Sequence, residues 1–154
     1  MYMDETKHKA VLWHEALDGL RLSRGDTVID ATLGGGGHTL LFFFFFGKTG
    51  RVVSLDMDQA AINRFLLRVK SESGLASAME EGQLLLVHAN FADIGDVAED
   101  SGLVQVDAIF ADLGYSSDQI EDESRGLSFL KDGPLDMRLD QRSGETAAHI
   151  VNVW

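Results

Sequence analysis

A run of four glycines at residues 34–37 constrains the fold of this chain more than any other feature. The apolar, β-branched residues 27–29 before it predict a buried strand, and residues 39–46 after it predict a helix. A strand, a glycine turn and a helix N-terminus place backbone N–H groups where a ligand can approach closely. Asp30, at the strand end, adds a carboxylate that suits an amine or a hydroxyl better than a phosphate. The alternative is a flexible glycine loop without a ligand.

Strand and helix patterns alternate along the rest of the chain. Strand patterns occupy residues 27–32, 51–55, 83–89 and 106–113. Helix patterns occupy residues 11–22, 39–46, 91–102 and 146–154, and a further helix begins after its N-cap at Asp58. Residues 1–9 predict a loose polar arm, and residues 71–82 predict a surface connection. Four alternations of strand and helix predict a parallel, doubly wound α/β sheet.

Two stretches stand apart from this alternation. Five phenylalanines at residues 42–46 would make their helix apolar on all sides, which predicts burial or a partner surface. Residues 115–142 are rich in charge and are interrupted by Gly126, Gly133 and Pro134. Because apolar residues are interleaved with the charges, we expect an ordered loop there, and loops of this length are usually functional or disordered.

Polar or aromatic residues follow each of the four predicted strands. They are Asp30 with the glycines, Asp56, Asn90 with Phe91, and Asp112. Doubly wound sheets bind ligands outside the carboxyl ends of their strands, near the point where the strand order reverses. We therefore expect these four groups to meet at one ligand crevice.

An acidic residue at the end of the second strand, here Asp56, accepts hydrogen bonds from the ribose hydroxyls of a nucleoside cofactor. A dinucleotide would require a third glycine after Gly37, and Asp30 would repel its phosphates. S-adenosylmethionine fits better, because its amine can meet Asp30 or a nearby acceptor and its carboxylate can meet the amides of the glycine turn, from Gly34 on. Phe91 can stack on the adenine, although a core aromatic is the alternative there.

Composition narrows the class of protein. The 154 residues suit one domain, and 45% hydrophobic content with a mean hydropathy of −0.02 is typical of a globular protein. The absence of cysteine excludes disulfides, thiolate zinc sites and thiol nucleophiles, and it fits a cytoplasmic location. A net charge of −12 argues against a generic nucleic-acid binder. The scattered histidines predict no metal site, and no signal peptide or membrane span is expected.

Three motifs carry a family resemblance that covers almost the whole chain. They are residues 30–38, residues 112–117 with Gln119, and residues 125–138, which include Asp132-Gly133-Pro134-Leu135-Asp136-Met137-Arg138. Together they closely resemble the MraW/RsmH family of class I, Rossmann-like methyltransferases. The resemblance implies S-adenosylmethionine-dependent methylation of the N4 amine of a cytidine in the decoding region of 16S rRNA. The implied partner is small-subunit rRNA or a ribosomal particle.

The resemblance also implies site residues. The implied cofactor contacts are Gly36, Gly37, His38, Asp56, Phe91, Asp112 and Gln119. The cytosine amine is a poor nucleophile, so an acceptor must hold its N–H groups in line with the methyl donor. Asp112, Ser116 and Ser117 are placed to be those acceptors, and Asp136 is a second carboxylate candidate. The alternative for Asp136 is a turn-stabilising carboxylate beside Arg138.

Some residues depart from the family pattern. Tyr115 and Asp118 stand where the family usually has an aliphatic residue and a proline, and the phenylalanine run is unusual. Members of the family are also longer, so this chain resembles their N-terminal part. Residues 1–114 would then bind the cofactor, and residues 115–154 would form an active-site loop and the start of a helical insertion. Two alternatives stay open: a methyltransferase of a small molecule or protein, and a cofactor-binding fragment without turnover.

Overall fold

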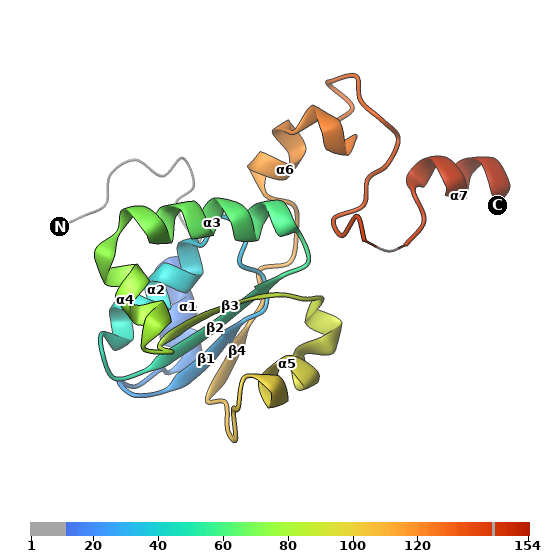
Figure 1. Cartoon of the computed structure of the whole chain (residues 1–154). Coiled ribbons are helices and arrows are strands. Elements are labelled where there is room, and N and C mark those ends of the chain that lie inside the picture. The colour runs from blue at the N-terminus through green and yellow to red at the C-terminus, as the bar shows by residue number, and fades with distance from the viewer. Residues whose placement is uncertain (1–11, 143) are drawn as a thin grey trace.

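A parallel four-stranded sheet forms the centre of the molecule (Figure 1). The computed structural model describes residues 12–142 and 144–154, so the arm expected at residues 1–9 lies outside the described part. The strands are β1 (Thr27–Asp30), β2 (Arg51–Asp56), β3 (Leu84–His88) and β4 (Ala108–Phe110), and their order is β3-β2-β1-β4. All three pairings are parallel. The predicted Rossmann-like α/β fold is confirmed.

Alternate strand residues are buried on opposite faces of the sheet, because successive side chains of a strand point to opposite sides. Val28 and Val52 belong to one apolar cluster, and Ile29 and Val53 belong to another. The first cluster includes buried side chains of α2 (Gly37–Phe46), α3 (Gln59–Ser71) and α4 (Ser73–Glu80). The second includes Val97 of α5 (Ile94–Asp100), which follows the short helix η1 (Phe91–Asp93). Figure 1 shows α3 and α4 above the sheet and α5 below it.

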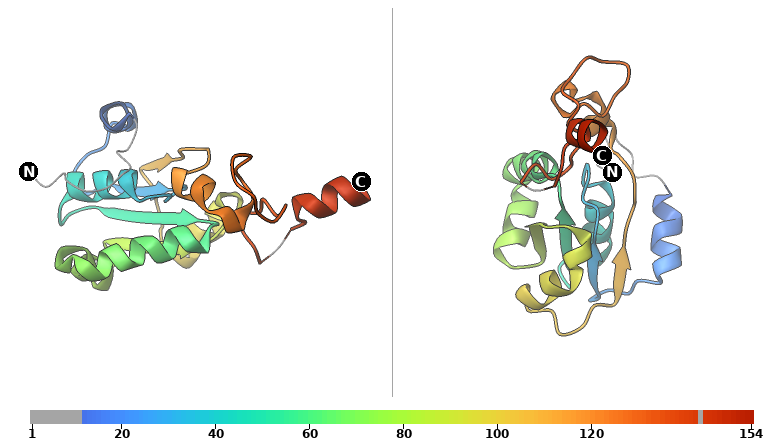
Figure 2. Two further views of the ribbon diagram at one scale, coloured as in Figure 1. Left: turned by 90° about the horizontal axis from the view of Figure 1, so that it is seen from above. Right: turned by 90° about the vertical axis from the view of Figure 1, so that its right-hand side faces the viewer.

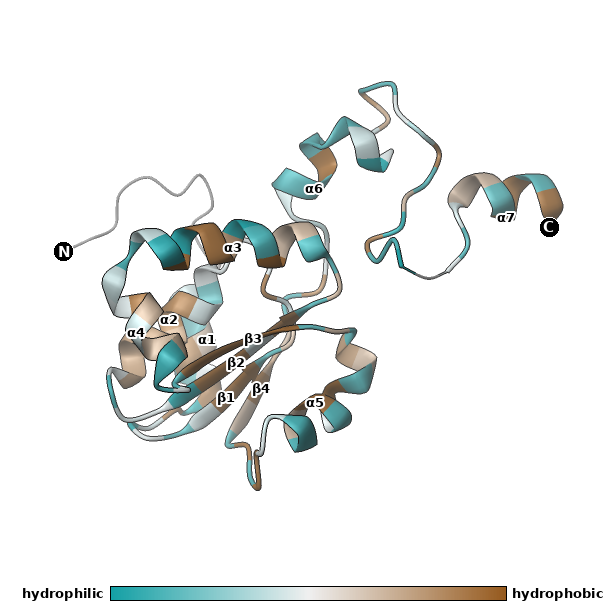
Figure 3. Ribbon diagram, viewed as in Figure 1, coloured by the Kyte–Doolittle hydropathy of each residue, from teal (hydrophilic) through white to brown (hydrophobic). Residues whose placement is uncertain are grey.

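The helix predicted after Asp58 forms as expected. Asp58 caps α3, because its side chain accepts a hydrogen bond from the backbone N–H of Ala60. The apolar spacing of α3 buries Ile62, Phe65 and Val69 against the sheet. Figure 3 shows the result as brown strands under a helix with alternating teal and brown turns.

The surface connection predicted at residues 71–82 is wrong. This stretch forms α4, whose Leu75 and Ala78 are buried in the core. These two residues are three positions apart and lie on one helical face, but the polar residues and glycines around them hide the pattern. The fourth strand is also shorter than predicted, since only Ala108–Phe110 pair with β1.

The phenylalanine run divides between core and surface. In α2, Phe42 and Phe46 are fully buried, whereas Phe44 keeps 64% of its surface exposed and Phe45 is also exposed. Leu17 and Leu20 of α1 (Trp13–Leu20) pack against the same core cluster. Burial therefore accounts for Phe42 and Phe46, Phe43 packs partly buried against the same cluster, and Phe44 and Phe45 leave part of the helix as an exposed apolar surface.

Residues 115–142 are ordered, as expected, but they contain two helices that were not predicted. These are α6 (Ser117–Glu121) and η2 (Glu123–Arg125), and α7 (Ala147–Val153) follows the loop. Gly126 has a φ of 64°, and a Cβ there would overlap the carbonyl of Pro134. The two arms of the loop thus cross in close contact. Figure 2 shows α7 extending beyond the sheet on the side where the strands end.

Candidate functional site

A cavity of about 340 Å³ lies at the carboxyl ends of the strands. The chain visits β2 and β3 on one side of β1 and then crosses to β4 on the other side, so the strand order reverses between β1 and β4. This is the place where doubly wound sheets bind ligands. The cavity is lined by residues 31–35, 37 and 38 after β1, Asp56 at the end of β2 and Met57 next to it, Phe91 after β3, residues 112–117 and Gln119 after β4, and Leu139.

Most of the predicted site residues lie together at this cavity. Those that line it are Gly34, Gly37, His38, Asp56, Phe91, Asp112, Ser116, Ser117 and Gln119. Asp30, Gly36 and Asp136 do not line it. The volume is at the lower end of the range of about 300–1,000 Å³ that small-molecule sites occupy.

The glycine turn is shaped by its own packing. Gly36 has a φ of 77° and is the N-cap of α2, and a Cβ there would overlap the ring of Phe65. Gly34 has a φ of 50°, but a Cβ there would meet no atom closer than the Thr32 carbonyl at 3.9 Å. Gly36 is therefore needed for contact with α3, whereas Gly34 faces open space beside the cavity.

Asp56 is held rigidly at the cavity wall. Its Oδ2 accepts a hydrogen bond from the Gly34 N–H at 2.8 Å, and its Oδ1 accepts one from the Asp58 N–H at 2.8 Å. Burial raises the pKa of Asp56, and these two hydrogen bonds act in the opposite direction. Each carboxylate oxygen retains a lone pair, so Asp56 can still accept hydrogen bonds from a ligand.

Asp30 lies beneath the glycine turn rather than in the cavity. It is fully buried, its Oδ1 accepts from the Thr32 N–H, and its Oδ2 accepts from the Thr39 hydroxyl at 2.7 Å. Burial, with smaller contributions from the charges of Asp56 and Asp112, raises the pKa of Asp30 to about 7. The structure does not support the expected direct contact between Asp30 and a ligand amine, because such a contact would require the turn to rearrange.

The other side of the cavity carries an exposed carboxylate and two rings. The Asp112 side chain is 61% exposed, and its Oδ2 lies 3.8 Å from the Nδ1 of buried His38. The ring of His38 packs on Phe110 with centroids 4.4 Å apart. Phe91 is 46% exposed and borders the cavity, so it is not the core aromatic that was the alternative reading.

Ser116 and Gln119 form the N-terminal cap of α6. The Ser116 hydroxyl accepts from the Gln119 N–H, and the Gln119 side-chain oxygen accepts from the Ser116 N–H. This reciprocal pair fixes the start of α6 at the cavity edge. The next residue, Ser117, lines the cavity and is exposed.

Asp136 makes the contacts that the alternative, a turn-stabilising carboxylate beside Arg138, would make. Nε and Nη2 of Arg138 donate to its two oxygens, each at 2.8 Å, and the Arg138 N–H also donates to it. The hydrogen bonds from Arg138 lower the pKa of Asp136 to about 2. A carboxylate that is away from the cavity and this weakly basic is a poor proton acceptor, so Asp136 stabilises the turn around Arg138.

Several cavity residues were missed by sequence reasoning. Met57 follows Asp56 directly, and Thr32 lies within the glycine motif, so extending each motif by a residue would have found them. Leu139 comes from the far arm of the 115–142 loop, and no local pattern marks it.

Neither a metal site nor a membrane span is found in the described part of the chain. Across residues 12–142 and 144–154, no three His, Asp or Glu side chains are grouped to hold a metal ion. Over the same residues, no helix has the length and apolar character needed to cross a bilayer.

Comparison with known proteins gives a consistent match. The family described as the MraW methylase family matches residues 5–154. The ribosomal RNA small subunit methyltransferase H of Thermomicrobium roseum is 45% identical over 152 residues, which cover 97% of this chain and 43% of that protein. The protein of the same name from Lactiplantibacillus plantarum is 40% identical over 148 residues, 96% of this chain and 44% of that protein.

Both relatives are longer than the chain. This chain spans less than half the length of the curated relatives that it matches. A solved structure from Clostridium thermocellum, whose description names an rRNA methylase, aligns at 22% identity with a TM-score of 0.46 and covers 60% of this chain and 48% of that chain.

Proposed function

Because the chain belongs to the MraW methylase family, we propose that it binds S-adenosylmethionine and serves in methylation of the N4 amine of a cytidine in the decoding region of small-subunit (16S) rRNA. The observation that carries this proposal is the cavity at the reversal of strand order, where Asp56, Phe91 and Asp112 meet. In this proposal residues 1–114 supply the cofactor site, and residues 115–154 supply the active-site loop and the start of the substrate region.

The charge and shape of the cavity support this cofactor. Two carboxylates border it, and among the described residues no Lys or Arg side chain lines it. Such a site suits a ligand with an amine and a cationic sulfur, and it offers no basic partner to the phosphates of a dinucleotide. Asp56 would accept from the ribose hydroxyls, and the ring of Phe91 would stack on the adenine. The cofactor supplies an activated methyl group when bound.

The residues after β4 would handle the substrate amine. Asp112, Ser116 and Ser117 lie at the cavity edge and carry oxygen atoms that can accept hydrogen bonds. Acceptors there would hold the two N–H groups of a cytosine amine and orient its lone pair toward the methyl group. Asp112 is the best proton acceptor of the three, since it is a carboxylate and is exposed to the cavity.

We expect Asp56→Ala to weaken the binding of S-adenosylmethionine by about 1.5–3 kcal/mol, the usual cost of losing a hydrogen bond to a charged group. Isothermal titration of the variant and the parent chain measures this loss. Asp56→Asn removes the charge but keeps one of the two acceptors for backbone N–H groups, so it should disturb the glycine turn less than Ala does. Asp100→Ala, which removes an exposed carboxylate at the end of α5, should bind as the parent does. Equal affinities for parent and Asp56→Ala would remove Asp56 from the site.

The substrate is tested by methyl transfer from labelled cofactor to small-subunit particles and their rRNA. A full-length relative should label a cytosine exocyclic nitrogen, identified by digestion and mass spectrometry. Label on a ring carbon would contradict the proposal, because carbon methylation normally needs a nucleophile such as cysteine and this chain has none. Label on a protein or a small molecule instead of rRNA would favour the alternative substrate class, which the net charge of −12 suits.

A second candidate function is cofactor binding without turnover. It is tested by assaying residues 1–154 beside the full-length relative. The exposed apolar side chain of Ile109 in β4 favours this candidate, since uncovered apolar sheet surface impairs folding and solubility. We expect residues 1–154 to transfer methyl groups at least about tenfold more slowly than the relative, a barrier difference of about 1.4 kcal/mol. Turnover within that factor would show that these residues are sufficient.

A further inference from the structure

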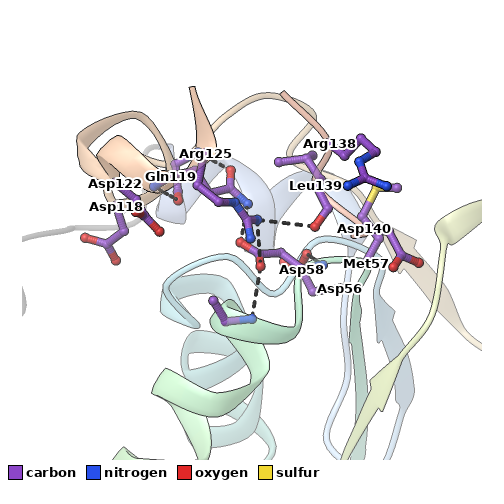
Figure 4. Close-up of polar contacts among 12 residues, drawn as sticks. Asp56, Met57, Asp58, Asp118, Gln119, Asp122, Arg125, Arg138, Leu139 and Asp140 are labelled. Atoms are coloured by element: carbon purple, nitrogen blue, oxygen red, sulfur yellow. Dashed lines mark hydrogen bonds and ion pairs between the residues drawn. The ribbon is translucent and has the colours of Figure 1, made fainter. Parts of the chain in front are cut away.

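A buried ion pair connects the 115–142 loop to the end of β2. Nη2 of Arg125 lies 2.8 Å from Oδ1 of Asp58, and both side chains are almost fully buried. Gln119 adds a second contact, because its Nε2 donates to Oδ2 of Asp58 at 3.1 Å. Figure 4 shows Arg125 and Gln119 reaching down from the loop to Asp58 at the start of α3. Asp58 is thus the point where the loop is fastened to the sheet domain.

The same arginine also holds the far arm of the loop. Nη2 of Arg125 donates to the Leu139 carbonyl at 3.2 Å, and the Arg125 carbonyl accepts from the Met137 N–H at 3.0 Å. Leu139 and Gln119 both line the cavity. Arg125 therefore contacts both the turn that bears Asp58 and the segment that brings Leu139 to the cavity.

Asp58, which binds the loop, is next to Asp56, the proposed ribose acceptor. Asp58 lies two residues after Asp56, and its N–H donates to Asp56 Oδ1. One tight turn thus carries the cavity carboxylate and the carboxylate that holds the loop. A shift of the loop would move this turn, and a ligand on Asp56 would in turn fix the loop.

We infer that Asp58 and Arg125 are positioning residues, a buried clamp that seats Gln119 and Leu139 against the cofactor cavity and couples the loop to ligand binding. The inference rests on the proposed function only for the identity of the ligand. A role in stability alone explains the pair less well, since the net stabilisation from a buried ion pair is often small. The Nε of Arg125 is also buried without a hydrogen-bond partner among the described residues, which lowers the stabilising value of the pair further.

A second ion pair between the loop and α3 is weaker. Nε of Arg64 lies 3.5 Å from Oδ2 of Asp118, and both side chains are more than one-third exposed. Although Nε of Arg64 is itself buried, this contact is longer than the 2.8 Å pair at Asp58, so the clamp at Asp58 should dominate the position of the loop.

The test compares five variants of the chain: Arg125→Gln, the charge-conserving Arg125→Lys, Asp58→Asn, the double variant Asp58→Asn/Arg125→Gln, and Arg142→Gln as the matched control. Asn at position 58 keeps an oxygen to cap α3. Arg142 also pairs with a carboxylate of the same loop, Asp140, but it is exposed and does not line the cavity. The readouts are hydrogen exchange of the 115–142 amides without ligand and titration with S-adenosylmethionine.

Each single clamp variant should speed exchange in residues 115–142, leave the strands protected, and weaken cofactor binding by at least about tenfold, or about 1.4 kcal/mol. The double variant should bind better than Arg125→Gln, because it no longer leaves the Asp58 carboxylate buried without its cation. Arg142→Gln should behave as the parent does.

Two results would overturn the clamp. One is unchanged loop exchange in Arg125→Gln. The other is loss of protection across β1 and β2 as well as the loop in Arg125→Gln and in the charge-conserving Arg125→Lys, which would make the pair a general stability element. If the parent chain does not bind S-adenosylmethionine, the proposed function fails on its own, and exchange of the loop still decides whether the clamp exists.

Discussion

Gly36→Ala is expected to lower the free energy of unfolding by about 2–5 kcal/mol, from about 1–2 kcal/mol of left-handed backbone strain and about 1–3 kcal/mol of overpacking. The strain arises because Gly36 has a φ of 77°. The overpacking arises because the new Cβ would overlap the ring of Phe65, which is buried in the close-packed core.

Gly34→Ala is the matched control for this prediction. Gly34 also has a positive φ, of 50°, but a Cβ there would meet nothing closer than 3.9 Å. Its cost should therefore be the backbone strain alone, about 1–2 kcal/mol. Urea unfolding of both variants and the parent measures the two costs. Equal losses for the two variants would show that Phe65 yields to the extra methyl group and that contact with α3 is not what requires Gly36.

The sheet and most of the cavity could be predicted because local patterns carry them. Buried parallel strands are short apolar runs, and Asp56 and Asp112 mark the ends of two of them. Parallel strands bring these ends to one edge, so the cavity follows from the order of elements. The helix α4 escaped prediction for the opposite reason. Its apolar face consists of Leu75, Ala76, Ala78 and Met79, which is too short a pattern to read.

Ser116, Ser117 and Gln119 of the loop were predicted to belong to the site, but the contacts of its far arm could not be predicted. Arg125 lies 67 positions after Asp58 in the chain, and its partner is decided by how the loop folds across Gly126 and Pro134. Asp30 is a different case, since the sequence places it correctly at a strand end. What the sequence does not contain is the direction of its side chain, which points to Thr39 under the glycine turn instead of into the cavity.

The burial of Asp30 leads to the second large expected effect. The free energy of unfolding should depend on pH through this residue, and Asp30→Asn should remove that dependence. The pKa of Asp30 is raised from 3.8 to about 7 by burial, so the folded protein holds a proton that the unfolded chain releases. A group whose pKa is higher in the folded protein than in the unfolded chain stabilises the folded state fully at pH values below its unfolded-state pKa. This stabilisation is lost as the pH rises to the folded-state pKa. Stability from this group should fall by about 1.4 kcal/mol per pH unit between about pH 4 and pH 7, about 4 kcal/mol in all.

Asn can replace the protonated form because the local hydrogen bonds can reverse direction. The Thr39 hydroxyl donates to the ionised Asp30, and the contact between the Thr39 and Ser54 hydroxyls at 2.8 Å allows either oxygen to donate. When Asp30 is protonated, or is replaced by Asn, the side chain at position 30 can donate to Thr39, and Thr39 can then donate to Ser54. The side chain at position 30 keeps an oxygen for the Thr32 N–H in both cases. The variant therefore preserves the network without the buried charge.

The measurement is the difference in unfolding free energy between Asp30→Asn and the parent, taken by urea unfolding at several pH values. All other titrating groups are common to both proteins, so the difference isolates Asp30. The variant should match the parent near pH 4 and become more stable by about 4 kcal/mol near pH 8, where the parent has to bury an ionised carboxylate. A difference that does not change with pH would contradict the prediction. It would mean that the hydrogen bonds from Thr32 and Thr39 offset the cost of burial and keep Asp30 ionised in the folded protein throughout this range.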